Sequence, residues 1–210
     1  MIEKELILYV EESILPLYFH FDRAHSTDHV ESVIERSLAL ATHYDVNLSM
    51  VYAIAAYHDI GLPLGREEHH INSARLLRED SRLREWFSEG EIEVMAEAVE
   101  DHRASSDHAP RSIYGRIVAE ADRLIEGDTV LRRTVQYGLA HYPELSREQH
   151  WQRFCAHLDE KYAEGGYLRL WIPESDNAKR LAELRQTIAN PTALREAFDR
   201  IFAEEYPANS

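Results

Sequence analysis

The stretch Ala55-Ala56-Tyr57-His58-Asp59-Ile60-Gly61 decides how this chain is interpreted. It predicts a His-Asp pair at the end of an apolar helix, just before Gly61 and Pro63. Metal-binding side chains at a helix end can reach one ion from different directions, and a carboxylate between two ions can bridge them. His58 and Asp59 are therefore candidate metal ligands. Because the dipeptide also arises by chance and can simply form hydrogen bonds or cap a turn, the rest of the chain must support this interpretation.

The composition indicates an acidic globular protein. The 210 residues suffice for one domain with a full core, so no metal is needed merely to hold the fold together. The formal net charge of -15 argues against nucleic acid or an anionic membrane as the main partner, because both would repel the protein. A small phosphorylated substrate remains compatible, because a bound metal and a few arginines can reverse the potential locally.

The cysteine content and the first residues indicate a cytoplasmic location. Cys155 is the one cysteine of the sequence, which excludes an internal disulfide and fits a reducing compartment. The start, Met1–Leu6, lacks a basic region followed by an apolar one, and no run approaches the ~18 apolar residues of a membrane span. We expect a cytoplasmic protein.

Apolar residues recur at three- and four-residue spacing along most of the chain, which predicts helices. These are expected over 2–20, from about 27, after residue 47, over 67–78, 91–103, 111–125, 129–141, 147–162 and 177–188, and from 191. Ser26 and Thr27 offer caps for the second helix, Asn47 for the third and Asn190 for the last. Gly166–Pro173 is the one stretch that looks extended. The sequence thus predicts an all-α fold.

Several ionisable side chains continue the apolar stripe of a predicted helix. They are His29, His58, His102 and Asp122. Residues on such a stripe point into the packing between helices, where burying a lone charge is costly. One shared metal ion would satisfy all of them.

Other interpretations of these residues stay open. A single inward histidine is more often a hydrogen-bonded core or cleft residue than a ligand. We keep that interpretation for His20, His25, His43, His108, His141, His150 and His157. Asp122 is also able to form a structural ion pair with Arg123. The metal centre is favoured by the order of His29, His58-Asp59 and Asp122 along the chain.

This order resembles the HD-domain superfamily of metal-dependent phosphohydrolases, whose pattern is a helical His, an adjacent His-Asp and a later Asp. The similarity runs from about Asp22 to Leu124. Its motifs are Ala24-His25, His29-Val30, His58-Asp59-Ile60-Gly61, His69 before Ser73-Ala74, and Ala121-Asp122-Arg123-Leu124. The resemblance implies an HD-domain-like helical bundle in which His29, His58, Asp59 and Asp122 bind one metal ion. We expect a single HD-type domain over 1–210, with the motif core at about 22–125 and a C-terminal helical extension at 126–210.

Some HD proteins hold a second ion on additional histidines, and His69 and His102 fall at the matching places. Asp59 would then face both ions. His70 competes with His69, and helical geometry does not choose between them. We favour His69 because its spacing to Ser73-Ala74 is similar to the family's His-x-x-x-Gly/Ser-Ala pattern.

The sequence departs from the motifs of two better-known branches of the superfamily, which argues against the activities of those branches. The cyclic-dinucleotide branch has a lysine after His-Asp-Ile-Gly and a later Gly-Tyr-Pro, whereas Leu62 follows here and that tripeptide is missing from the sequence. The stringent-response hydrolases carry a Glu-Asp shortly after their His-Asp, and Ile60–Gly65 has no acidic pair. We carry over neither activity.

The resemblance implies hydrolysis of a small phosphate ester, such as a nucleotide, by metal-activated water. Histidine and aspartate suit one or two ions of Mn, Fe, Ni, Co or Zn. For catalysis we single out Asp59, Asp101 as a partner of His102 or in proton transfer, and Arg103 as a phosphate ligand. Two alternatives stay open, because the same six ligands hold two irons in a few HD oxygenases, and a metal-binding regulatory module need not be catalytic.

Overall fold

The computed structural model describes residues 1–21 and 27–206, and every regular element in these ranges is a helix. The α-helices are α1 (Lys4–Tyr9), α2 (Thr27–Ala41), α3 (Leu48–Tyr57), α4 (His69–Glu79), α5 (Glu89–Glu100), α6 (Ile113–Asp122), α7 (Gly127–His141), α8 (Arg147–Lys161), α9 (Asn177–Ile188) and α10 (Pro191–Glu205). A π-helical turn lies at Val10–Ile14, and 3-10 turns lie at Leu15–His20, Leu62–Leu64 and Ser81–Glu85. The predicted all-α fold is confirmed. Ser26 and His25 lie outside the described residues.

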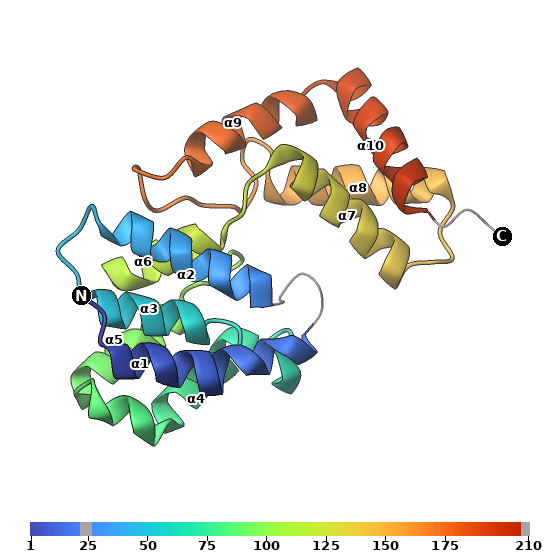
Figure 1. The fold of residues 1–210 in the computed structure, drawn as a ribbon. Coiled ribbons are helices and arrows are strands. Elements are labelled where there is room, and N and C mark those ends of the chain that lie inside the picture. Colours follow the sequence, from blue (N-terminus) through green and yellow to red (C-terminus); the bar gives the residue numbers. More distant parts are fainter. Residues whose placement is uncertain (22–26, 207–210) are drawn as a thin grey trace. The chain divides into compact units, whose positions relative to one another are not determined.

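The chain divides into two compact units, whose helices are labelled in Figure 1. Unit 1 comprises Met1–Arg123 and Trp171–Ser175, and unit 2 comprises Leu124–Leu170 and Asp176–Ser210. The division falls close to the border expected between motif core and extension. That all 210 residues form one domain stays a prediction.

Helix α3 lies at the centre of unit 1. Its residues from Ser49 to Tyr57 are all buried, because the sequence is apolar around the whole circumference of the helix. Helices α2, α5 and α6 pack against α3, and α4 packs on α5. Because α3 is enclosed in this way, the two residues that follow it, His58 and Asp59, are only 0% and 3% exposed.

Side-chain caps fix where several helices begin. The Asn47 side chain accepts from the backbone N–H of Ser49 at the start of α3, and the Asn190 side chain accepts from that of Ala193 at the start of α10. Both caps were predicted. Ser88 opens α5 with a capping box completed by Glu91, which was not predicted.

Helices α5 and α6 end before the predicted residues. Helix α5 ends at Glu100, not at residue 103, so His102 lies in a turn and does not continue the helical stripe. Helix α6 ends at Asp122 and not at residue 125. Gly166–Pro173 contains no helix, as expected, and none of its residues is assigned to a strand. The apolar spacing continues past each helix because the following turn also buries side chains.

Unit 2 consists of α7 to α10 packed around aromatic side chains. The rings of Phe154 and Phe198 are both fully buried, with their centroids 5.2 Å apart. In the described residues of both units, no helix has the length and apolar character needed to cross a membrane.

Residues Trp171–Ser175 belong to unit 1, where a buried glutamate of α6 forms hydrogen bonds with them. Glu120 is 0% exposed, and its Oε2 accepts from the backbone N–H of Trp171 at 2.7 Å. Its Oε1 accepts from the hydroxyl of Ser175 at 2.5 Å. These bonds replace the water that the carboxylate loses on burial, and they tie the segment to the helix that ends at Asp122.

Candidate metal centre

Four predicted ligands from three parts of the chain converge at the end of α3. His29 comes from the first turn of α2, His58 and Asp59 follow α3, and Asp122 is the last residue of α6. The Nε2 atoms of His29 and His58 are 3.2 Å apart. Oδ1 of Asp122 lies 3.3 Å from Nε2 of His29, and Oδ2 of Asp59 lies 3.3 Å from Nε2 of His58. We call these four residues the first donor group.

The second donor group consists of His69, His102 and Asp59. The Nε2 atoms of His69 and His102 are 3.2 Å apart, and they lie 3.3 and 3.5 Å from Oδ1 of Asp59. The choice of His69 over His70 agrees with this geometry, because His69 is the member of the pair that reaches Asp59 and His102. His70 instead places its ring edge-on beside that of His69.

Asp59 belongs to both groups through different oxygen atoms. Oδ2 faces His29 and His58, whereas Oδ1 faces His69 and His102. The two groups therefore share one carboxylate, which is the arrangement of a bridging ligand between two cations.

Three of the imidazoles are oriented in the same way. Nδ1 of His58, His69 and His102 lies 2.7, 2.8 and 2.6 Å from the carbonyl oxygen of the residue three positions earlier. A carbonyl only accepts hydrogen bonds, so each Nδ1 carries the proton and donates it. In the neutral ring, Nε2 then presents its lone pair to the centre. Such second hydrogen bonds are typical of metal-binding histidines.

The donor set fits a metal ion. Two nitrogen ligands about 2.1 Å from one ion, at the angles of tetrahedral or octahedral coordination, are about 3.0–3.4 Å apart. The 3.2 Å separations of His29 from His58 and of His69 from His102 fall in this range. Each donor group could therefore hold one divalent ion.

The electrostatics of the centre favour a bound cation. Burial acts to lower the pKa of His58, but the carboxylates of Asp59 and Asp122 outweigh it and raise this pKa to about 9. Burial and the neighbouring His102 lower the pKa of His69 to about 4. Although burial opposes it, His58 and His102 hold the pKa of Asp59 well below its usual range. At neutral pH the carboxylates are thus ionised and His69 is neutral.

The Tyr18 side chain holds the backbone at Asp59 in place. The Tyr18 hydroxyl donates to the carbonyl of Ala56 at 2.9 Å and accepts from the N–H of Asp59 at 3.2 Å. Tyr18 lies far from Asp59 along the chain, so the sequence carried no signal for this role.

Gly61 fixes the position of α4 relative to Asp59. The Gly61 N–H donates to the Ser73 hydroxyl at 2.9 Å. A Cβ at position 61 would lie 2.5 Å from both the His69 carbonyl oxygen and the Ser73 nitrogen. Glycine is therefore required for this close approach of the turn to the helix that carries His69.

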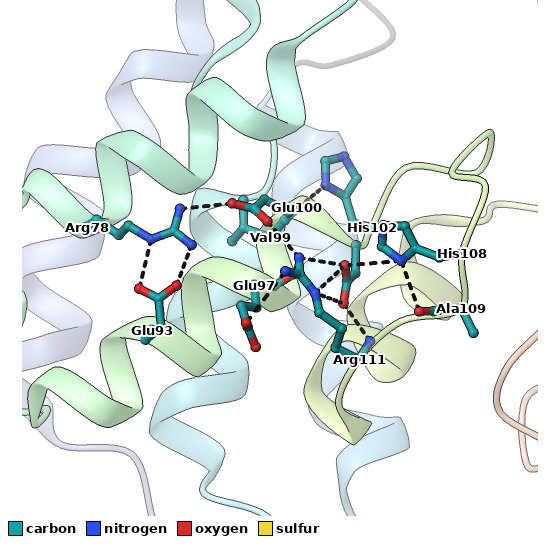
Figure 2. Close-up of polar contacts among 10 residues, drawn as sticks. Arg78, Glu93, Glu97, Val99, Glu100, His102, His108, Ala109 and Arg111 are labelled. Carbon is teal, nitrogen blue, oxygen red and sulfur yellow. Dashed lines mark hydrogen bonds and ion pairs between the residues drawn. The ribbon is translucent and has the colours of Figure 1, made fainter.

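The structure does not bring Asp101 to the His102 imidazole as expected. His102 donates from Nδ1 to the Val99 carbonyl (Figure 2). The Asp101 carboxylate instead accepts from the backbone N–H, Nε and Nη2 of Arg111. A role for Asp101 in proton transfer stays a prediction. Arg111 was missed, because it appeared only as the first residue of a predicted helix.

Arg103, the predicted phosphate ligand, has different surroundings from Arg132. Arg103 donates from Nη1 to the carbonyl of Glu67, just before α4. Arg132, in unit 2, pairs with Asp128, Glu204 and Glu205. The guanidinium of Arg132 is thus occupied by carboxylates, whereas that of Arg103 is held by one neutral carbonyl.

Comparisons with known proteins agree with the resemblance. Residues 27–126 match the family model of the HD domain. The crystal structure of a predicted HD superfamily hydrolase from an uncultured Thermotogales bacterium matches with a TM-score of 0.50 and 23% identity, over 74% of this chain and 87% of that one. At this identity the likeness concerns the fold. No curated protein matches the sequence.

Proposed function

We propose that this chain, whose residues 27–126 match the HD domain, is a metal-dependent phosphohydrolase that hydrolyses a small phosphate ester such as a nucleotide. The observation that carries this proposal is the position of Asp59 between two histidine groups. In this proposal His29, His58, Asp59 and Asp122 hold one divalent ion, while His69, His102 and Asp59 hold a second.

The bound ions would supply Lewis acidity and lower the pKa of a coordinated water toward ~7. The chain's own contribution is to fix the donors, which the Nδ1 hydrogen bonds and the contacts of Tyr18 and Gly61 accomplish. Arg103 can bind a phosphate oxygen, because its hydrogen bond to Glu67 uses Nη1 and leaves the other N–H groups of the guanidinium for a substrate. A small substrate is favoured over nucleic acid by the net charge of -15.

The experiment tests which metals support turnover and whether turnover requires oxygen. The protein is stripped with a chelator, reloaded with Mn, Co, Ni, Zn or Fe under nitrogen, and assayed for phosphate release from phosphomonoesters and nucleotides. We expect turnover with several of these metals without oxygen, because hydrolysis needs no change of oxidation state. Elemental analysis of the same samples gives the number of ions per chain.

Two results would contradict the proposal. The first is activity that requires iron and air and consumes oxygen, which would favour a di-iron oxygenase. The second is bound metal without turnover of any phosphate ester, which would favour a regulatory module. His43→Ala is the matched control, because it removes an exposed histidine of unit 1 outside both donor groups.

A further inference from the structure

Asp101 carries a buried carboxylate that is enclosed by one arginine. Its side chain is 0% exposed. Oδ2 accepts from the backbone N–H of Arg111 at 2.6 Å, and Oδ1 accepts from Nε at 3.0 Å and from Nη2 at 2.8 Å. Because removing a cation from a buried carboxylate is strongly destabilising, this pair fixes the two ends of the connection between α5 and α6.

The fixed connection begins at a proposed metal ligand. His102 directly follows Asp101 and lies beyond the last residue of α5. Its backbone N–H is 3.5 Å from the Val99 carbonyl, a long hydrogen bond. The imidazole of His102 is oriented by its Nδ1 bond to Val99, but its backbone is held only weakly by the helix, and the Asp101–Arg111 pair restrains the preceding residue.

The same arginine extends the restraint to α4. Arg111 donates from Nη2 to Oε2 of Glu100 at 2.7 Å, and Arg78 of α4 donates to Oε1 of Glu100 at 2.9 Å (Figure 2). Arg78 also pairs with Glu93 of α5. Helix α4 begins at His69, so this row of charges joins the two elements that carry the histidines of the second donor group.

We infer that Arg111 is the positioning residue of the second metal site, acting through Asp101 and Glu100 on the separation of His102 from His69. The inference rests on the proposed function only in requiring two ions at the centre. Arg111 contacts neither donor group in the bonds described, so it acts through its partners. Loss of a residue that hydrogen-bonds a metal ligand directly typically costs 10- to 100-fold in metal affinity, and Arg111 lies one contact further away.

A purely structural role makes a different prediction. If the contacts of Arg111 with Asp101 and Glu100 only stabilised the fold, their loss would lower the melting temperature. It would not weaken the binding of one ion more than that of the other. The readout that separates these cases is the affinity of each ion, measured by titrating metal-free protein with Co²⁺ and following visible absorption and equilibrium dialysis.

We expect Arg111→Ala to weaken the second Co²⁺ about 10-fold, the lower end of the range for a direct partner of a ligand, and to leave the first unchanged. Arg111→Lys should lie between Arg111→Ala and wild type, because an ammonium restores the charge but not the paired N–H groups. Should Arg111→Ala fail to fold, Asp101→Asn carries the same test, with the same selective loss expected.

Arg84→Ala is the matched control. Arg84 pairs with Glu89 at the opposite end of α5, and its side chain is 40% exposed, against 39% for Arg111. Equal second-ion affinities in the Arg111 and Arg84 variants would overturn the inference. A wild type that binds one ion would overturn both this inference and the two-ion centre, whereas a wild type that binds two ions but hydrolyses no phosphate ester would contradict only the proposed function.

Discussion

Nε2 of His58 lies 3.3 Å from Oδ2 of Asp59, although consecutive side chains of an α-helix project about 100° apart. The approach is possible because α3 ends at Tyr57 and Asp59 lies in the turn that follows. If α3 continued further, the side chains of His58 and Asp59 would lie on different faces of the helix. Because it ends at Tyr57, both side chains reach the same centre.

Asp59→Ala should remove most of the bound metal and abolish turnover, because Asp59 is the one residue shared by both donor groups. The far-UV circular dichroism should stay close to wild type, since the core of unit 1 is large enough to fold without an ion. Elemental analysis of protein purified without chelator measures the loss, and Asp45→Ala, an exposed aspartate of unit 1, is the control. Unchanged metal content in Asp59→Ala would refute the assignment.

His69→Ala and His102→Ala should each lower the metal content less than His58→Ala, yet still reduce turnover. The reason is that they belong to the second donor group, while the first stays complete. His70→Ala is the neighbouring control and should keep the wild-type metal content. If His70→Ala loses metal and His69→Ala does not, the assignment of His69 is incorrect, and if neither His69→Ala nor His102→Ala has an effect, the centre holds one ion.

Gly61→Ala should destabilise the protein and weaken the second ion. The added Cβ would meet the His69 carbonyl oxygen and the Ser73 nitrogen at 2.5 Å, and overpacking of this kind costs about 1–3 kcal/mol. Thermal unfolding and metal content measure the two effects. Gly90→Ala is the control, because nothing lies within 4 Å of its Cβ position and alanine favours a helix, so its stability should be equal to or above wild type.

The stability of unit 1 should fall at alkaline pH in a way that depends on Tyr9. Burial and a hydrogen bond to the Asp80 carboxylate raise the pKa of Tyr9 to about 12, against about 10 in an unfolded chain. The proton is thus bound more tightly in the folded state, and the stabilisation present below pH 10 is lost as the pH rises toward 12. Urea unfolding of wild type and Tyr9→Phe from pH 9 to 11 tests this, and parallel pH profiles would contradict it.

The sequence located the candidate ligands more closely than the ends of the helices that carry them. The apolar stripes and the order of His29, His58-Asp59 and Asp122 depend on local spacing, which a sequence displays directly. The end of α5 before His102 was missed because Asp101 and His102 are buried in a turn and so prolong the apolar pattern. Contacts such as Arg111 with Asp101, or Tyr18 with Asp59, join residues whose pairing follows only from the tertiary fold.

The bonds of Glu120 to residues 171–175 bear on how the protein is made. The ribosome synthesises α6 well before it adds Trp171. At about 5–20 residues per second, the interval between the two is roughly 3–10 s. During that interval the Glu120 carboxylate lacks the backbone N–H and hydroxyl that it accepts from in the finished protein. Cotranslational folding of unit 1 therefore reaches completion only after α7 and α8 of unit 2 have emerged.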